Sequence, residues 1–214
     1  MQHCRGRSGF GQGSVVTAAL DPTARLLQEL LIYAVMPLWL LAGFGDWLLH
    51  RWQRIEERVG WREPALHLLM VGEIATGLAA ALLLQITAAV LVLLLGVAIA
   101  HEVTVWRDLS YAAARRRIAV PEQWVHALQI VIPWAALATL AVIHRDQLGA
   151  IVGSGRADWS LRLKDAPLPL EQVLAILVGG TLLVGIPILE ELWRGVRASR
   201  RRAAHAPDQT VRLA

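Results

Sequence analysis

Long apolar runs and short polar segments alternate along the chain. The runs consist mostly of leucine, alanine and valine, and each is close to the roughly 20 residues that a helix needs to cross a bilayer. Strands of a membrane barrel would alternate apolar and polar positions, and these runs do not. The pattern therefore predicts an all-α integral membrane bundle of about five transmembrane helices, over residues 26–49, 64–84, 88–106, 124–143 and 170–192.

The arginines predict how this bundle lies in a membrane. They gather between the first two runs, between the third and fourth, and after the fifth, whereas the turn at 85–87 has none. Loops rich in arginine and lysine stay in the cytoplasm, so we expect an external N-terminus and a cytoplasmic C-terminus. Around a transmembrane domain at 26–193, we expect a flexible tail at 1–25 and a basic cytoplasmic tail at 194–214.

Composition agrees with a membrane protein. Only 18% of the 214 residues are charged, whereas soluble domains have about 25%. The excess of Lys+Arg (21) over Asp+Glu (17) lies in clusters between the runs, which indicates membrane orientation and lipid contact and no nucleic-acid binding. Cys4 is the only cysteine, which excludes an internal disulfide and a thiolate metal cage. We expect a bacterial inner-membrane protein, whose oligomeric state the sequence leaves open.

Ionisable side chains gather at the predicted cytoplasmic ends of the first four runs, although each costs about 2.5–3.5 kcal/mol at a helix centre. Asp46 and His50 are four residues apart, as are Glu122 and His126, so each pair shares a helix face. Such residues are candidates for a functional site. The eight candidate metal ligands are Asp46, His50, His67, Glu73, His101, Asp108, Glu122 and His126.

Depth along the helices, at about 1.5 Å per residue, predicts that these eight residues form two layers. The deeper layer contains Asp46, Glu73, His101 and His126, and the layer nearer the cytoplasm contains His50, His67, Asp108 and Glu122. Each layer has two carboxylates and two imidazoles, a donor set that suits Fe, Mn or Zn. We therefore predict one to two divalent metal ions per chain.

One pair fits this arrangement poorly. His67 and Glu73 are six residues apart, which places them roughly 120° from a common helix face. Glu63, four residues before His67, shares its face and is an alternative ligand to Glu73.

Residues 46–126 resemble the carboxylate-bridged di-iron bundles, in which ligands project inward from four helices, and small bacterial inner-membrane proteins with Asp-x-x-x-His and Glu-Gln-x-x-His helices. The resemblance implies a helical bundle around a dinuclear centre. Two departures limit it. Glu122 and His126 have one residue more between them than the Glu-x-x-His of di-iron bundles, and the His-box triplets of membrane desaturases are absent.

Several functions fit these residues. We favour a metal-dependent oxidoreductase, in which a lipid-soluble or quinone-like substrate enters sideways from the membrane. A metal-dependent membrane hydrolase would use the same ligands to lower the pKa of bound water. A divalent-cation or proton transporter remains open, although transport sites usually lie near the midplane between inverted repeats. A haem site is disfavoured by the interleaved carboxylates, and a structural subunit would use the same groups for interhelical salt bridges.

Other charged residues are interpreted without a site. The arginines at 115–117 suit a topology signal and contact with anionic lipid, and His144 suits the opposite membrane boundary. Glu190 and Glu191 can pair with arginines one turn further on, Arg194 and Arg197, and are therefore left outside the site.

Overall fold

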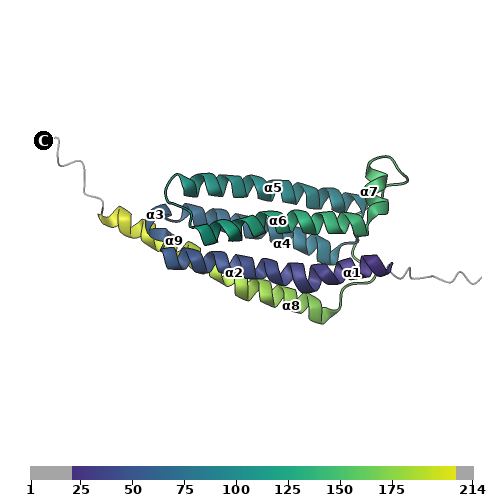
Figure 1. The fold of residues 1–214 in the computed structure, drawn as a ribbon, viewed down its shortest axis with the longest axis horizontal. Helices are drawn as coiled ribbons and strands as arrows, with labels where there is room; N and C mark the ends of the chain where they lie inside the picture. The colour runs from purple at the N-terminus through teal and green to yellow at the C-terminus, as the bar shows by residue number, and fades with distance from the viewer. Residues whose placement is uncertain (1–20, 206–214) are drawn as a thin grey trace, which may run out of the picture.

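The protein is described here from a computed structural model, which places residues 21–205 (Figure 1). This part of the chain is helical and contains no strand, which confirms the all-α prediction. Five continuous helices within it are long and apolar enough to cross a membrane: Pro22–Gln53, Arg62–Leu83, Ala88–Ala113, Val120–Ile143 and Leu170–His205. The predicted number of helices that could cross a membrane is therefore confirmed.

The first and last of these helices are composite. The first consists of α1 (Pro22–Leu30), the π-helix η1 (Leu31–Val35) and α2 (Met36–Gln53). The last consists of α8 (Leu170–Gly180), the π-helix η2 (Thr181–Gly185) and α9 (Ile186–His205). Between them lie α3 (Glu56–Val59), α4 (Arg62–Leu83), α5 (Ala88–Ala113), α6 (Val120–Ile143) and α7 (Arg145–Ile151).

The ends of the bundle differ from the predicted segments. Helix α1 begins at Pro22, inside the segment expected to be a tail, and α9 continues through most of the basic segment to His205. Residues 1–20 and 206–214, which complete the two expected tails, lie outside the described residues.

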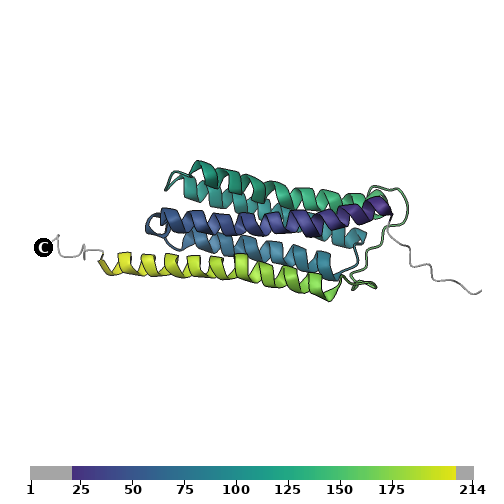
Figure 2. The same ribbon diagram turned by 60° about the horizontal axis from the view of Figure 1, so that its bottom comes forward.

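The long helices form a closed ring. Helix α2 packs against α6, α6 against α5, α5 against α4, α4 against α9, and α9 against α2. Figures 1 and 2 show them side by side along the whole bundle. We call the end with α3 and the α5–α6 connection the site end, and the end with α7 and the α4–α5 turn the distal end. Side chains from five helices can therefore meet inside the ring.

Local sequence sets the ends of several helices. The Thr87 hydroxyl accepts a hydrogen bond from the Val90 backbone N–H and caps α5. Pro121 lies in the first turn of α6, where a missing N–H has no helical partner to lose. Arg54 adopts a left-handed conformation, with φ of 51°, and ends α2. Thr87 lies at the distal end, whereas Pro121 and Arg54 mark the two tight connections at the site end, where α3 begins two residues after Arg54.

Prolines also coincide with the π-helical turns. Pro37 and Pro187 each come two residues after a π-helix, η1 and η2 respectively. A proline lacks the N–H that would bond the preceding turn, so a widened turn accommodates it. Helix α6 instead continues through Pro133 without such a turn.

A single glycine brings α9 against the bundle at the site end. A Cβ on Gly195 would lie 2.6 Å from the Gly60 carbonyl oxygen and 2.9 Å from the Trp61 Cα. Only glycine permits this approach, because the neighbouring atoms are backbone and cannot move aside cheaply. Glu191 precedes Gly195 by one turn on the same face, so the close contact also turns Glu191 inward.

Candidate metal centre

The site end of the ring encloses a cluster of polar side chains. His50, Glu63, Glu122 and Glu191 have no exposed surface. Around them lie the other buried members of the cluster, which are Asp46, His67, His101, Asp108, Arg116 and His126. Burial of so many ionisable groups is costly unless they are paired or hold a metal. The hydrogen-bond and ion-pair partners of each ionisable side chain therefore show whether it is already compensated or could bind a metal ion.

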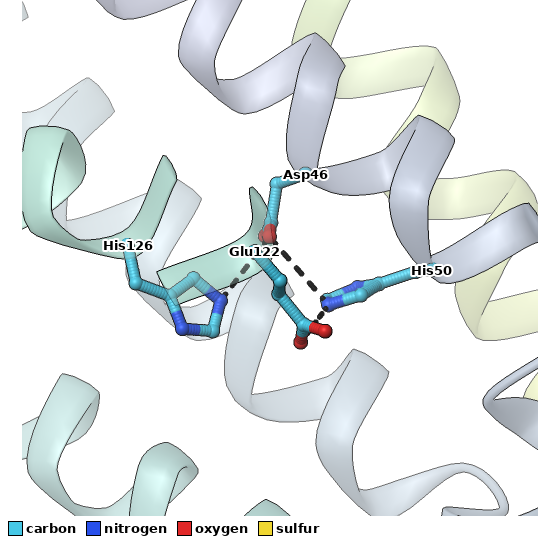
Figure 3. Close-up of side chains that lie close together, drawn as sticks. All are labelled: Asp46, His50, Glu122 and His126. Carbon is cyan, nitrogen blue, oxygen red and sulfur yellow. Dashed lines mark hydrogen bonds and ion pairs between the residues drawn. The ribbon is translucent and has the colours of Figure 1, made fainter. Parts of the chain in front are cut away.

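Four of the predicted ligands converge between α2 and α6 (Figure 3). The His50 Nε2 lies 3.0 Å from the Glu122 Oε1 and 3.5 Å from the Asp46 Oδ1. The His126 Nε2 lies 3.1 Å from the same Asp46 oxygen. One ligand atom from each of the four residues lies within 4.8 Å of all the others. The two pairs with four-residue spacing thus face one another across the helix interface.

These distances suit a metal ion. Nitrogen and oxygen donors at about 2.0–2.2 Å from a tetrahedral ion are roughly 3.4 Å apart. Within the described residues, the Asp46 Oδ1 has no aligned hydrogen bond, although the His126 nitrogen is close to it. Two nearby atoms that do not point at one another can both face a third partner. The four residues therefore fit a divalent ion.

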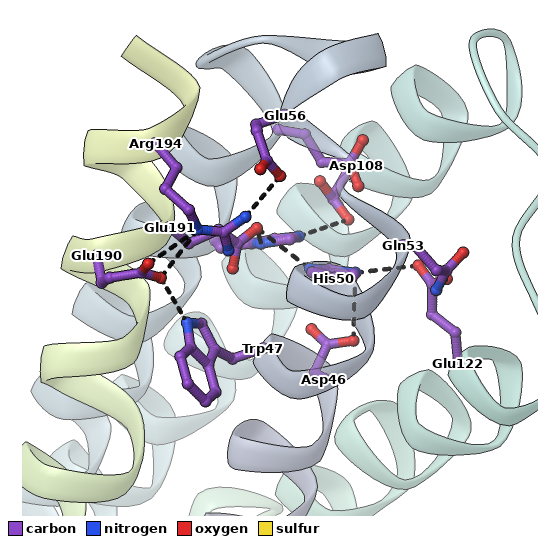
Figure 4. Close-up of polar contacts among 12 residues, drawn as sticks. Asp46, Trp47, His50, Gln53, Glu56, Asp108, Glu122, Glu190, Glu191 and Arg194 are labelled. Atoms are coloured by element: carbon purple, nitrogen blue, oxygen red, sulfur yellow. Dashed lines mark hydrogen bonds and ion pairs between the residues drawn. The ribbon is translucent and has the colours of Figure 1, made fainter. Parts of the chain in front are cut away.

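Glu191 belongs to the cluster, which corrects its placement outside the site. The His50 Nδ1 lies 3.1 Å from the Glu191 Oε1, and the His67 Nδ1 lies 3.3 Å from the same oxygen (Figure 4). When the His50 Nδ1–H donates to this carboxylate, the Nε2 is left free to bind a metal. A carboxylate in this position fixes both the tautomer and the orientation of a ligand histidine.

Glu190, in contrast, makes the arginine pair that the sequence predicts. Its carboxylate accepts hydrogen bonds from the Arg194 Nε at 3.0 Å and from the Trp47 indole N–H at 2.9 Å (Figure 4). Arg51 completes this partly exposed group. The two adjacent glutamates therefore differ because one faces the rim of the bundle and the other faces its interior.

A second group of possible ligands surrounds His67. His50, Glu63 and His67 offer atoms within 4.8 Å of one another, and the two imidazole rings stack with centroids 5.0 Å apart. The His67 Nε2 also lies 3.3 Å from the Asp108 Oδ2. Glu63, the alternative ligand suggested by helix spacing, is thus beside His67. Both groups include His50, so they are adjacent.

Arg116 lies buried inside the cluster, which corrects its interpretation as a contact with anionic lipid. Its Nη1 donates to the Glu122 Oε2 at 2.9 Å and its Nε donates to the Glu63 Oε1 at 3.2 Å. Burial alone would lower the pKa of Arg116, but the hydrogen bonds with Glu122 and Glu63 hold that pKa above its usual range. The guanidinium is therefore a permanent positive charge that joins α4 to the start of α6.

Glu73 and His101 form a separate pair deeper in the bundle. The His101 Nδ1 lies 3.5 Å from the Glu73 Oε2, and Glu73 accepts a hydrogen bond from the Thr104 hydroxyl at 2.8 Å. Among the described residues, neither nitrogen of His101 has a hydrogen-bond partner. The six-residue separation of His67 and Glu73 explains the division, because the two side chains leave α4 on different faces.

The predicted division into two layers by depth is wrong. Asp46 and His126 were placed in the deeper layer and His50 and Glu122 in the outer one, but these four form a single group. Residues one turn apart reach the same point, because side chains extend along the helix axis as well as away from it. Residues of the two predicted layers therefore mix, and the candidate ligands are grouped by the helix interface at which they lie.

An apolar cavity adjoins the cluster inside the ring. It has a volume of about 320 Å³, and side chains of α2, α4, α5, α6, α8, η2 and α9 line it. Its polar wall consists of Asp46, His67, His101, Asp108, His126 and Gln129. The volume lies within the usual range for small-molecule sites. A ligand in this cavity would therefore touch the polar cluster directly.

Comparison with protein-family models, curated proteins and solved structures finds no match for this chain. The buried cluster, which could hold a metal ion, supports the resemblance to metal-binding bundles only to that extent. The function must therefore be argued from the geometry of the site.

Proposed function

We propose that the chain is an integral membrane metalloprotein with two divalent metal ions at the site end, and that it acts as an oxidoreductase. The ions would be Fe, Mn or Zn, since histidine and carboxylate ligands suit them. Oxidoreductase chemistry requires Fe or Mn, because Zn has no redox change. Asp46, His50, Glu122 and His126 would hold one ion, and His67 with Glu63 or Asp108 would hold the other.

The observation that supports this proposal is the charge of the buried cluster. Its fully or nearly buried carboxylates are Asp46, Glu63, Asp108, Glu122 and Glu191. Arg116 is the one buried side chain with a permanent positive charge among the described residues. Four negative charges remain, and two divalent cations balance them while the histidines stay neutral. Uncompensated buried charges would be strongly destabilising.

A bound metal ion would supply an electron-transfer centre with coordination positions left open for a substrate. The protein's own residues perform the other tasks. Glu191 orients His50, Gln53 donates a hydrogen bond to the Glu122 Oε2 at 2.9 Å, and the apolar lining of the cavity would favour a lipid-soluble substrate beside the polar wall. A lipid-soluble substrate would reach this wall from within the membrane, whereas a hydrolase would need water at the same place.

A proton or cation transporter is the second candidate, because the same charge count favours it. Protonated histidines would compensate the remaining carboxylates without a metal ion. The histidines His50, His67, His101 and His126 are all buried in contact with or close to a carboxylate. Metal content separates a proton transporter from the proposed metalloprotein.

Elemental analysis of protein purified in detergent without chelator should give close to two equivalents of Fe, Mn or Zn per chain. Protein exposed to a strong chelator and then to each metal in turn provides the matched control for adventitious ions. Metal-free protein with an intact melting transition would contradict the proposal and favour protonated histidines. A Soret band without non-haem metal would indicate haem instead.

We also propose that the bundle lies in a bacterial inner membrane with its site end in the cytoplasm. The arginine-rich connections after α2 and α5 and the arginines of α9 all lie at the site end, as the positive-inside rule requires. Reporter fusions after Arg54, after Arg116 and after the C-terminal residue should give cytoplasmic signals, and one at Gln85 should give an external signal. An external signal after Arg116 would reverse the orientation.

A further inference from the structure

A second cavity lies in the distal half of the ring. It has a volume of about 440 Å³ and lies between the distal parts of the long helices. Apolar side chains dominate its wall, including Val35, Leu82, Leu94, Leu137 and Leu140. Its polar groups are at the distal end, where Gln85, His144 and Lys164 lie. This cavity is away from the metal centre and has no part in the proposed function.

The two cavities meet at a shared wall. The residues that line both are Met36, Trp39, Ile74, Leu78 and Ile176. They come from α2, α4 and α8, and their side chains are apolar. The cavities therefore adjoin along the bundle at this shared wall, which we call the neck, and none of its five side chains is charged.

The length of this passage matches a long hydrocarbon chain. His67 lines the first cavity and Leu82 lines the second, fifteen positions further along α4. At 1.5 Å per residue they are roughly 22 Å apart, which is most of the roughly 30 Å hydrocarbon thickness of a bilayer. A compact substrate would fill only one of the two cavities, and a long chain would extend through both.

The distal end of the passage is covered. The backbone N–H of Gln85 donates to the Arg162 carbonyl, and the N–H of Lys164 donates to the Leu83 carbonyl, both at 2.9 Å. The Lys164 ammonium donates to the Ala81 carbonyl at 2.6 Å, and burial lowers the pKa of that lysine. The loop that contains Lys164 is thus fixed to the α4–α5 turn, and the chain would end beneath it.

The polar wall at the site end determines which head group a long-chain ligand could have. Both His101 nitrogens and the Asp108 Oδ1 are buried without hydrogen-bond partners among residues 21–205, and both residues line the first cavity. Among the described residues, no arginine or lysine lines this cavity to bind a phosphate or carboxylate head. A neutral head that accepts and donates hydrogen bonds suits this wall better.

We propose that the two cavities form one binding passage for a long-chain quinone or quinol, with the ring at the His101 end and the chain extending through the neck into the distal cavity. This inference rests on the proposed function, because it takes the polar wall as the place where the substrate reacts. It adds the substrate class and a chain-binding site in the distal half of the bundle.

Photolabelling with quinones tests the passage. One probe has a diazirine next to the ring, and the other has it at the end of a chain about 20 Å long, to match the passage. We expect the ring probe to label the first cavity, at Met70 or Val71, and the chain-end probe to label the distal cavity, at Leu137 or Leu140. Labelling by the chain-end probe confined to membrane-facing residues such as Val92 and Leu95 would overturn the proposal.

A neck variant sharpens the test. Ile74→Trp should lower chain-end labelling of the distal cavity at least tenfold and leave ring labelling intact, because the indole fills the neck. Ala79→Trp is the matched control, since Ala79 is exposed on the same helix and lines neither cavity. If Ile74→Trp does not fold, Leu78→Phe repeats the test one turn further on. Equal distal labelling in a folded neck variant and the control would overturn the proposal.

Two further measurements identify the head group and separate this inference from the proposed function. A fatty acid of equal chain length should fail to compete with the quinone, and competition as strong as the quinone's own would overturn the neutral-head claim. Metal is measured in the same samples. Protein that holds metal but labels only on its outer surface overturns the passage alone, and metal-free protein with distal labelling overturns the metal centre alone.

Discussion

Arg116→Met should lower the melting temperature of the detergent-solubilised protein by about 6–20 °C. The substitution leaves Glu63 and Glu122 fully buried without their guanidinium partner. Breaking a buried ion pair on one side costs about 3–5 kcal/mol, and in a domain of this size each kcal/mol shifts the melting temperature by roughly 2–4 °C. The expected loss is large because two carboxylates lose the same cation.

The neighbouring arginine provides the control. Arg117 is exposed, so Arg117→Met should change stability by no more than about 0.5 kcal/mol. Adding Glu63→Gln to Arg116→Met should recover part of the loss, since it removes one unpaired charge. Equal melting temperatures for Arg116→Met and Arg117→Met would show that the arginine does not stabilise the cluster.

His50→Ala and His126→Ala should each abolish binding of one metal equivalent. Both histidines are candidate ligands of the ion between α2 and α6, and the second ion, beside His67, keeps its own ligands. His144→Ala should retain both equivalents, because His144 lines the distal cavity. Elemental analysis of folded, monodisperse protein measures the three ratios. Retention of both equivalents by His50→Ala would contradict the assignment.

Glu191 offers a graded version of the same experiment. Glu191→Gln leaves the candidate ligands in place and weakens only the orientation of His50. We expect two equivalents at saturating metal, with an affinity about 10–100-fold lower. An unchanged affinity would mean that the contact between Glu191 and His50 serves the packing of α9 and not the metal.

Helix periodicity predicted the four candidate ligands that lie on α2 and α6. Asp46 with His50 and Glu122 with His126 have the spacing of a shared face, and the structure brings these two faces together. The five helices that could cross a membrane followed equally from run length. Both the ligand pairs and the long helices could be predicted because each depends only on residues close together in the sequence, which helix geometry relates to one another.

The remaining contacts depend on packing that periodicity does not describe. Arg116 lies between two helices, so no face could be assigned to it. Glu190 and Glu191 have the same arginine spacing, and the close approach at Gly195 decides which of them turns inward. A long, mainly apolar stretch, from Val173 to Leu189, that ends in two adjacent carboxylates was the available signal.

Anomalous X-ray scattering from crystals of protein purified without chelator would test the metal centre most directly. Data at the absorption edge of the bound element should show a peak between α2 and α6, about 2.0–2.2 Å from the His50 Nε2 and an Asp46 oxygen. A second peak should lie near His67, about 3.5–4 Å from the first. Well-phased maps without an anomalous peak among these residues would contradict the account.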